Sequence, residues 1–159
     1  HDRYRRQRQM CIRDSLNALD ANTTGIVNAG SITSLTGTSE TLSEVYSSYG
    51  ITGLGDEQVA IVDTTASAAA LNLINSKTIG AIDASKLTKI TGTGADAKTA
   101  FESAGISGLI FDASNYLASY TDLLAAFGND LATAKSHYFS NGVSEGRSFD
   151  AFDLSLIHI

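Results

Sequence analysis

The 159-residue chain contains no proline or tryptophan, one methionine and one cysteine. The single cysteine, Cys11, lies near the N-terminus, so the rest of the chain cannot build a disulfide framework. No apolar run approaches the roughly 18 residues of a membrane-spanning helix, which predicts that the chain does not span a membrane. Threonine, serine, glycine, asparagine and aspartate fill much of the remainder, as in proteins whose short elements are joined by many turns.

Basic residues are few and unevenly placed. The chain carries 11 basic and 17 acidic residues, a formal net charge of −6. Five arginines and two aspartates lie within residues 1–15; without this stretch six basic residues stand against 15 acidic ones, a net charge of −9. An acidic, lysine-poor body argues against nucleic-acid binding, which requires a basic face that releases counterions. It suits a solvated extracellular surface.

The two ends of the chain differ in composition from its body. Residues 1–15 (HDRYRRQRQMCIRDS) and the terminal LSLIHI resemble translated sequencing-adapter read-through at the ends of metagenomic gene predictions. We therefore expect residues 1–15 and 154–159 to be added tails and the natural segment to cover about residues 16–153. A genuine basic tail that binds a polyanion is the alternative interpretation.

The body is dominated by an internal repeat. Residues 71–109 align without a gap to residues 16–54 at an offset of 55 positions. The residues that mark the alignment are Leu16/Leu71, Asn17/Asn72, Gly25/Gly80, Thr36-Gly37-Thr38/Thr91-Gly92-Thr93, Gly50-Ile51/Gly105-Ile106 and Gly53-Leu54/Gly108-Leu109. A period of this size is typical of a repeat array rather than of a single closed domain. The sequence predicts two 55-residue α/β repeats over residues 16–110, the second incomplete.

The clearest helix of each repeat has apolar residues at i, i+3, i+4 and i+7, which predicts one buried stripe. These residues are Leu42, Val45, Tyr46 and Tyr49 in the first copy and Ala97, Ala100, Phe101 and Ala104 in the second. Thr38 and Thr93 are the predicted N-caps. Gly50 and Gly105 are predicted to end the helices in the left-handed conformation.

Two further elements are predicted between these helices. Residues 58–63 (QVAIVD) are β-rich and read as a strand with Val59 and Ile61 on one face. Asp63, Thr64 or Thr65 is the expected cap of a helix over residues 67–75. Its buried stripe comprises Ala70, Leu71 and Ile74.

After Gly80, a strand or a strand–turn–strand is expected. Its inward residues are Ile82, Leu87 and Ile90, which match Val27, Ile32 and Leu35 of the first copy. Alternating β and α elements favour parallel strands joined by crossover helices. Repeated at a fixed period, they predict the α/β class and a short tandem-repeat strand–helix solenoid.

The pattern changes after residue 110, where a helical hairpin is predicted over residues 111–148. The first helix has the apolar positions Tyr116, Leu117, Tyr120, Leu123, Leu124 and Phe127. Asp112 or Ser114 can cap its start, and Gly128 its end. A second helix from Asn129 or Asp130 to Gly142 must run antiparallel because the connection is short. Phe111-Asp112-Ala113 returns as Phe149-Asp150-Ala151, so residues 149–153 are predicted to begin another copy.

Residues 111–151 resemble a tandem repeat of large bacterial surface and secreted proteins, close to D-A-x-x-Y-I-A-S-Y-x-D-L-I-x-A-F-G…HY…G…EGR. The residues that carry the resemblance include Tyr116, Tyr120, Asp122, Phe127, Gly128, His137, Tyr138, Glu145, Gly146 and Arg147. The 55-residue units are similar to Thr/Ala/Gly-rich repeats of giant marine bacterial proteins. Such proteins often carry RTX calcium-binding nonapeptides or protease domains. Because no Gly-Gly-x-Gly-x-Asp motif occurs here, calcium is implied for the relatives alone.

Residue types that catalysis requires are scarce. A nucleophile needs a neighbouring base and a zinc site needs three or four ligands, yet His137 is the one histidine between the tails. No phosphate-binding Gly-x-x-x-x-Gly-Lys-Ser/Thr motif is present. We expect His137, Glu145 and Arg147 to tie the second helix to its loop. Candidates for an oxygen-ligated cation are carboxylates in turns, namely Asp56, Glu57, Asp63 and Asp83.

These patterns predict a non-enzymatic structural or adhesive segment of a large secreted or cell-surface bacterial protein, without a cofactor. Its expected partners are neighbouring repeats of the same chain and a cell-surface or extracellular ligand. The alternative is a calcium-responsive module of an RTX-like secreted protein, because carboxylates are in excess in turns. An enzyme, the third class, would need a cleft with several titratable residues that converge on His137.

Overall fold

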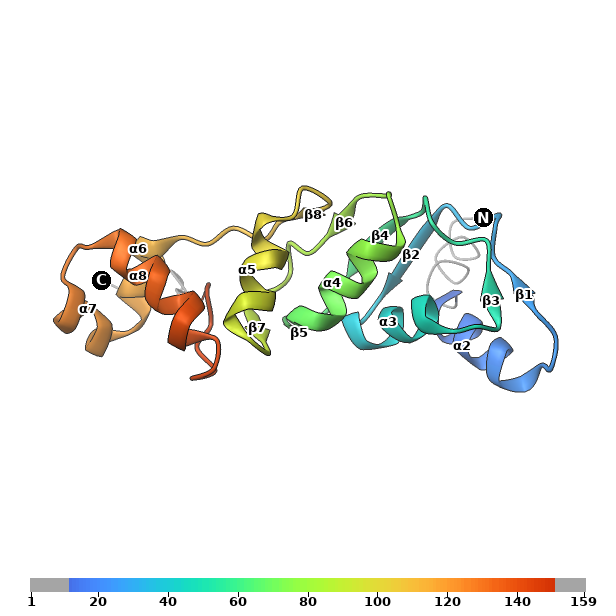
Figure 1. Ribbon diagram of the computed structural model, residues 1–159, viewed down its shortest axis with the longest axis horizontal. Helices are drawn as coiled ribbons and strands as arrows, with labels where there is room; N and C mark the ends of the chain where they lie inside the picture. Colours follow the sequence, from blue (N-terminus) through green and yellow to red (C-terminus); the bar gives the residue numbers. More distant parts are fainter. Residues whose placement is uncertain (1–11, 151–159) are drawn as a thin grey trace, which may run out of the picture.

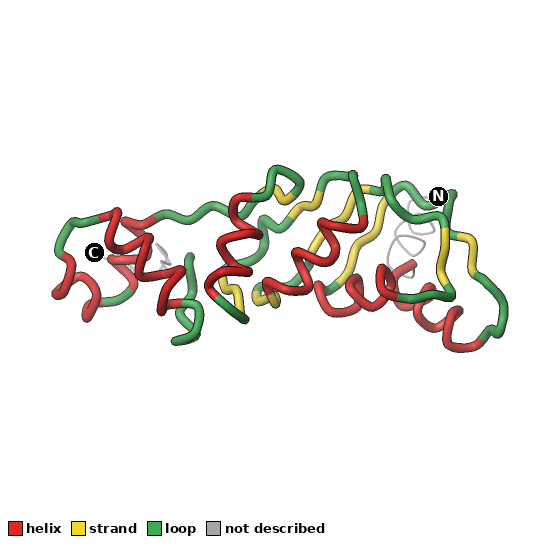
Figure 2. The backbone as a smooth tube through the Cα atoms, in the orientation of Figure 1, coloured by secondary structure: helices red, strands yellow, loops and turns green. Residues whose placement is uncertain are grey.

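The computed structural model describes residues 12–150, with side chains from Leu16 onward, as an elongated molecule of mixed α/β class (Figure 1). Helices α3 (Ser39–Ser47), α4 (Ala68–Lys77) and α5 (Gly94–Glu102) lie side by side (Figure 2). Helix α2 (Ile12–Asn22) packs against α3 at the N-terminal end. Because α2 begins at Ile12, the expected boundary between tail and body falls within a helix. The rest of both predicted tails lies outside the described residues.

Short strands lie behind this row of helices, and all their pairs are parallel. One sheet has the order β2 (Ser34–Gly37), β4 (Gln58–Ile61), β6 (Ile82–Asp83), β8 (Ile106–Ser107). Two smaller sheets pair β1 (Val27–Asn28) with β3 (Ile51–Thr52) and β5 (Thr65–Ser67) with β7 (Lys89–Thr91). The predicted α/β class with parallel strands is confirmed.

The strand register has a near-constant offset along the chain. Val27 pairs with Ile51, Ser34 with Gln58, Thr65 with Lys89 and Ile82 with Ile106, in each case 24 positions apart. The pairs between β4 and β6 are 23 positions apart. Each parallel step must be connected by a crossover, and the helices supply it.

The predicted N-caps of two helices are confirmed. The Thr38 hydroxyl accepts a hydrogen bond from the Thr41 N–H at 3.2 Å, and the Thr93 hydroxyl accepts one from the Asp96 N–H at 3.1 Å. The side-chain oxygen thereby satisfies one of the N–H groups that have no partner within the first turn.

The predicted left-handed glycine ends of these helices are wrong. The helices end at Ser48 and Ser103 in extended backbone, and neither Gly50 nor Gly105 has positive φ. Each of these glycines is instead approached by the end of a side chain from elsewhere in the chain, which would have to move if a Cβ were added. A Cβ on Gly50 would lie 1.8 Å from Asp20 Oδ1.

The predicted stripe is also one residue too long in each copy. Leu42, Val45 and Tyr46 are buried, but Tyr49 is fully exposed, and Ala104 is exposed as well. Both residues follow the end of their helix, so the helical period no longer directs them to the core.

Helix α4 follows the predicted strand but lacks the predicted cap. Its N-cap is Ser67, whose side chain makes no capping hydrogen bond, because Thr65–Ser67 form strand β5. The Asp63 carboxylate accepts hydrogen bonds from the N–H and the hydroxyl of Ser39 instead, at 2.7 and 2.8 Å. Asp63 was expected to cap α4 but instead caps the start of the preceding helix, α3.

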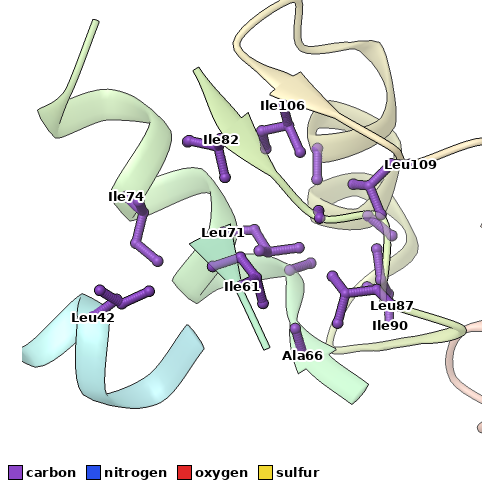
Figure 3. Packing of buried hydrophobic residues seen from close by; sticks show 14 of the residues in the cluster. Leu42, Ile61, Ala66, Leu71, Ile74, Ile82, Leu87, Ile90, Ile106 and Leu109 are labelled. Atoms are coloured by element: carbon purple, nitrogen blue, oxygen red, sulfur yellow. The ribbon is translucent and has the colours of Figure 1, made fainter. Parts of the chain in front are cut away.

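The apolar core runs continuously through the row of helices and strands. Figure 3 shows Ile74 of α4 directed toward Leu42 of α3. Ile82, Leu87 and Ile90 are buried as predicted, on a strand–turn–strand formed by β6 and β7.

The C-terminal part consists of short helices, namely α6 (Ala113–Ser119), α7 (Thr121–Phe127), α8 (Leu131–His137) and the π-helix η1 (Tyr138–Gly142). The predicted caps Asp112 and Asp130 and the predicted end at Gly128, with φ of 58°, are confirmed. The predicted continuous first helix is wrong, because Tyr120 leaves the helical conformation with φ −131° and ψ 98°. The Tyr120 hydroxyl accepts a hydrogen bond from the Ser148 N–H at 2.7 Å.

This helical part is packed onto the end of the row of helices. The Phe101 ring of α5 makes edge contacts with four aromatic rings, at centroid distances of 5.1–6.4 Å, and η1 packs against α5. The N–H groups of Phe149 and Asp150 donate to the Thr88 carbonyl, just as those of Thr88 and Lys89 donate to the Thr64 carbonyl. Residues 149–150 thus lie beside β7 much as β7 lies beside β5.

Candidate functional site

The polar residues of the C-terminal motif gather around Arg147. Its guanidinium donates to both Asp122 carboxylate oxygens, at 3.1 and 2.7 Å, and its Nε donates to Glu145 at 2.5 Å. It also lies 4.7 Å from the centroid of the Tyr120 ring. Two-pronged pairing of this kind fixes the direction of both partners. These hydrogen bonds, donated to Asp122 and Glu145, raise the pKa of Arg147 above its usual range.

His137 stands beside this cluster, between a phenol and a carboxylate. Its Nδ1 lies 3.2 Å from the Tyr116 hydroxyl, and its Nε2 lies 3.8 Å from Glu145 Oε1. Burial raises the pKa of Tyr116 to about 12, so this hydroxyl stays neutral at physiological pH. No serine, threonine or cysteine side chain hydrogen-bonds to the imidazole within residues 16–150. The arrangement connects α6, α8 and the loop after η1, but it supplies no activated nucleophile.

Replacing Arg147 by alanine is expected to lower the melting temperature by about 3–6 °C, since two carboxylates and the Tyr120 face lose their shared partner. Arg147→Lys should restore only part of the loss, because an ammonium cannot form the two-pronged pair. Thermal melts at low and high salt measure both variants. Because the Asp122 and Glu145 side chains are 62% and 41% exposed, the loss should shrink at high salt. A lysine variant indistinguishable from the wild type would contradict the geometric role.

The four carboxylates predicted as cation ligands are not brought together. In the part of the chain that the structure describes, no three or more histidine, cysteine, aspartate or glutamate residues form a group able to hold a metal ion. Asp63 is engaged by Ser39, and Asp83 Oδ1 accepts from the Ser85 N–H at 3.0 Å. Glu57, with only 1% of its surface exposed, accepts from the Tyr46 hydroxyl and from the N–H groups of Gly55 and Asp56.

We therefore expect melting curves of this chain in millimolar calcium and in excess chelator to coincide. The carboxylates with defined contacts satisfy local N–H and hydroxyl donors, and calcium requires six to eight oxygen ligands around one centre. Far-UV circular dichroism as a function of temperature measures this. Magnesium at the same concentration controls for general ionic effects. A shift with calcium but not with magnesium would contradict the expectation.

Two hollows on the surface of the described residues are candidate binding sites, and His137 lines neither of them. A groove of about 520 Å³ lies between α5 and α8, with Gly94, Lys98, Lys135 and Phe139 among its lining residues. The other, of about 470 Å³, lies at the N-termini of α3 and α4 and includes Glu40 and Asp63. Neither hollow combines a nucleophile with a histidine base.

No family model matches this chain. No curated protein and no solved structure matches it either. Between residues 12 and 150, no helix has the length and apolar character needed to cross a membrane. The contacts of its own residues are therefore the basis for any functional assignment.

Sequence reasoning missed a buried polar pair. Glu57 is predicted as a candidate cation ligand in a turn, and Tyr46 as a member of a buried helical stripe, yet the two side chains are hydrogen-bonded to each other in the core. The sequence did contain a signal for this pair, namely a tyrosine on a stripe predicted to be buried. A buried phenol hydroxyl needs a polar partner, so a polar residue was to be expected beside it.

Proposed function

We propose that this chain is a non-enzymatic structural segment of a solenoid-like repeat array in a large secreted or cell-surface bacterial protein. The observation that carries the proposal is the parallel strand register, in which successive pairs are offset by 23 or 24 residues. In such an array each coil buries its apolar face only against its neighbours. The secreted or surface location rests on the resemblance of residues 111–151 alone.

Contacts repeated at the 55-residue offset support a two-coil unit. The Asn17 side-chain amide donates to the Thr41 carbonyl at 3.3 Å, and the equivalent Asn72 donates to the Asp96 carbonyl at 3.0 Å. Gly53 and Gly108, also 55 apart, have φ of 87° and 83°. The strand pairs repeat at the same offset, because Val27 pairs with Ile51 and, 55 positions later, Ile82 pairs with Ile106.

The proposed mechanism is mechanical. Stacked coils form a stiff spacer whose exposed serine, threonine and asparagine side chains present a polar face to an extracellular partner. The enzyme alternative is disfavoured by the surroundings of His137, which contacts Tyr116 and Glu145 rather than a nucleophile. A His137→Ala variant should lose stability without losing any activity of the parent protein.

The proposal predicts that a single repeat unit cannot fold alone. Residues 16–54 contain α2 from Leu16 onward and all of α3, but the residues that cover α3 on its other side, such as Ile74, belong to the next coil. We expect this fragment to give no cooperative thermal transition, while the full chain melts cooperatively. Far-UV circular dichroism on both samples makes the comparison. A stable, cooperative melt of residues 16–54 would overturn the repeat-array proposal.

A further inference from the structure

The two ends of the row of strands and helices differ. At the C-terminal end η1 packs against α5, and residues 149–150 lie beside β7. At the N-terminal end, within residues 12–150, β1 pairs only with β3 and β2 pairs only with β4. One side of each of these strands therefore has no strand partner among the described residues.

Leu19 of α2 is the first sign that this end lacks a neighbour. It lies 55 positions before Ile74, which is 0% exposed and faces Leu42 of the preceding helix (Figure 3). Leu19 itself is 53% exposed. In the second copy, α3 covers Ile74. In the first copy, no helix of the described residues covers Leu19, the equivalent side chain.

Gly25 is the second, independent sign. Its counterpart 55 positions later, Gly80, lies so close to the preceding coil that a Cβ would be 2.0 Å from the Glu57 carbonyl oxygen. A Cβ on Gly25 would meet only the Thr23 hydroxyl, at 3.6 Å, and the φ of Gly25 is not positive. No contact of the described residues requires glycine at position 25, whereas a preceding coil like that of Glu57 would require it.

We infer that the face formed by α2, β1 and β2, with Leu19 and Gly25, is a stacking face that docks a further strand–helix coil of the same kind. The occupant is a segment like residues 39–70, because Leu42 and Glu57, the residues that approach Ile74 and Gly80, both belong to it. Its helix places a leucine over Leu19, and its main chain passes against Gly25. This inference rests on the proposed function, since it extends the array by one coil.

A grafted chain tests the docking face. A copy of residues 39–70 is placed directly before Leu16 in exchange for residues 1–15, which reproduces the junction between Ala70 and Leu71. Docking should raise the melting temperature by about 5 °C or more above that of a control graft whose copied segment carries the Leu42→Asp change. Both grafts have the same length and the same N-terminus, so the difference between them reports docking.

Two substitutions in the body make the test specific. Leu19→Lys and Gly25→Ala should change the melting temperature of the ungrafted chain by less than about 1 °C, because neither position is covered there. In the docked graft, each substitution should lower the melting temperature by several degrees. Equal effects in grafted and ungrafted chains, or equal melting temperatures of the two grafts, would overturn the docking face. The melt of isolated residues 16–54 tests the repeat array separately, so the two failures can be told apart.

Discussion

Replacing Glu57 by alanine is expected to destabilise the fold by about 3 kcal/mol, among the largest effects of any single polar residue in this chain. Its carboxylate is buried and accepts hydrogen bonds from the Tyr46 hydroxyl and from the N–H groups of Gly55 and Asp56. Alanine removes the acceptor shared by the buried Tyr46 hydroxyl and by the part-buried N–H groups of Gly55 and Asp56. Chemical denaturation monitored by circular dichroism measures the loss.

Two matched variants separate the contributions. Glu57→Gln keeps an oxygen for the backbone donors and should cost about half as much as alanine. Tyr46→Phe removes one hydroxyl and should cost about 1 kcal/mol. If Glu57→Ala were no worse than Tyr46→Phe, the backbone donors would have found other partners and the account of this pair would be wrong.

The charge of Glu57 gives stability a definite pH dependence. Burial alone would raise the pKa of Glu57, but hydrogen bonds from Tyr46 and from the backbone hold it below its usual value. A carboxyl with a lower pKa in the folded state stabilises the fold at pH above its unfolded value, near 4.3, and this contribution is lost as pH falls through the folded value. Below about pH 4 the wild type should therefore lose stability more steeply than Glu57→Gln.

The second large effect is expected for Gly80→Ala, at about 2–3 kcal/mol. The added methyl group would lie 2.0 Å from the Glu57 carbonyl oxygen, and a backbone atom cannot swing away as a flexible side chain can. Either the segment that contains Glu57 or the turn before β6 must shift. Urea denaturation of the purified variant measures the change in the free energy of unfolding.

Gly25→Ala is the matched control, because it changes the equivalent residue of the first copy. Its Cβ would have a single ordinary contact at 3.6 Å, so the substitution should alter stability by less than about 0.5 kcal/mol. A loss at Gly25 as large as that at Gly80 would show that both positions require the conformational freedom of glycine, rather than room for the main chain of another segment.

For α3 and α5, local rules predicted the helix and its N-cap but not what ends it. The periodic stripe of Leu42, Val45 and Tyr46 and the cap at Thr38 depend on residues within a few positions of one another, so they are visible in the sequence. Gly50 was assigned to a helix end because glycine is common there. In the structure Gly50 is approached by the Asp20 carboxylate, 30 positions earlier in the chain, a contact that no local pattern reveals.

Long-range partners explain the remaining differences. Tyr120 interrupts a well-patterned helix where its hydroxyl and ring face Ser148 and Arg147, residues 28 and 27 positions away. Glu57 is drawn into the core by Tyr46 and by the turn that precedes it. The offset of 24 residues between paired strands was not visible in the sequence either. The clearest sequence identity is found at an offset of 55 residues, and strands that pair with each other have little sequence in common.

The position of Phe149 and Asp150 beside β7 has a consequence for solubility. An uncovered strand edge offers N–H and C=O groups that can template the edge of another molecule, the usual first step of strand-mediated aggregation. Because both N–H groups donate to Thr88, that carbonyl is already satisfied from within the chain. A truncation before Phe149 would expose it and should make the protein prone to self-association at this one edge.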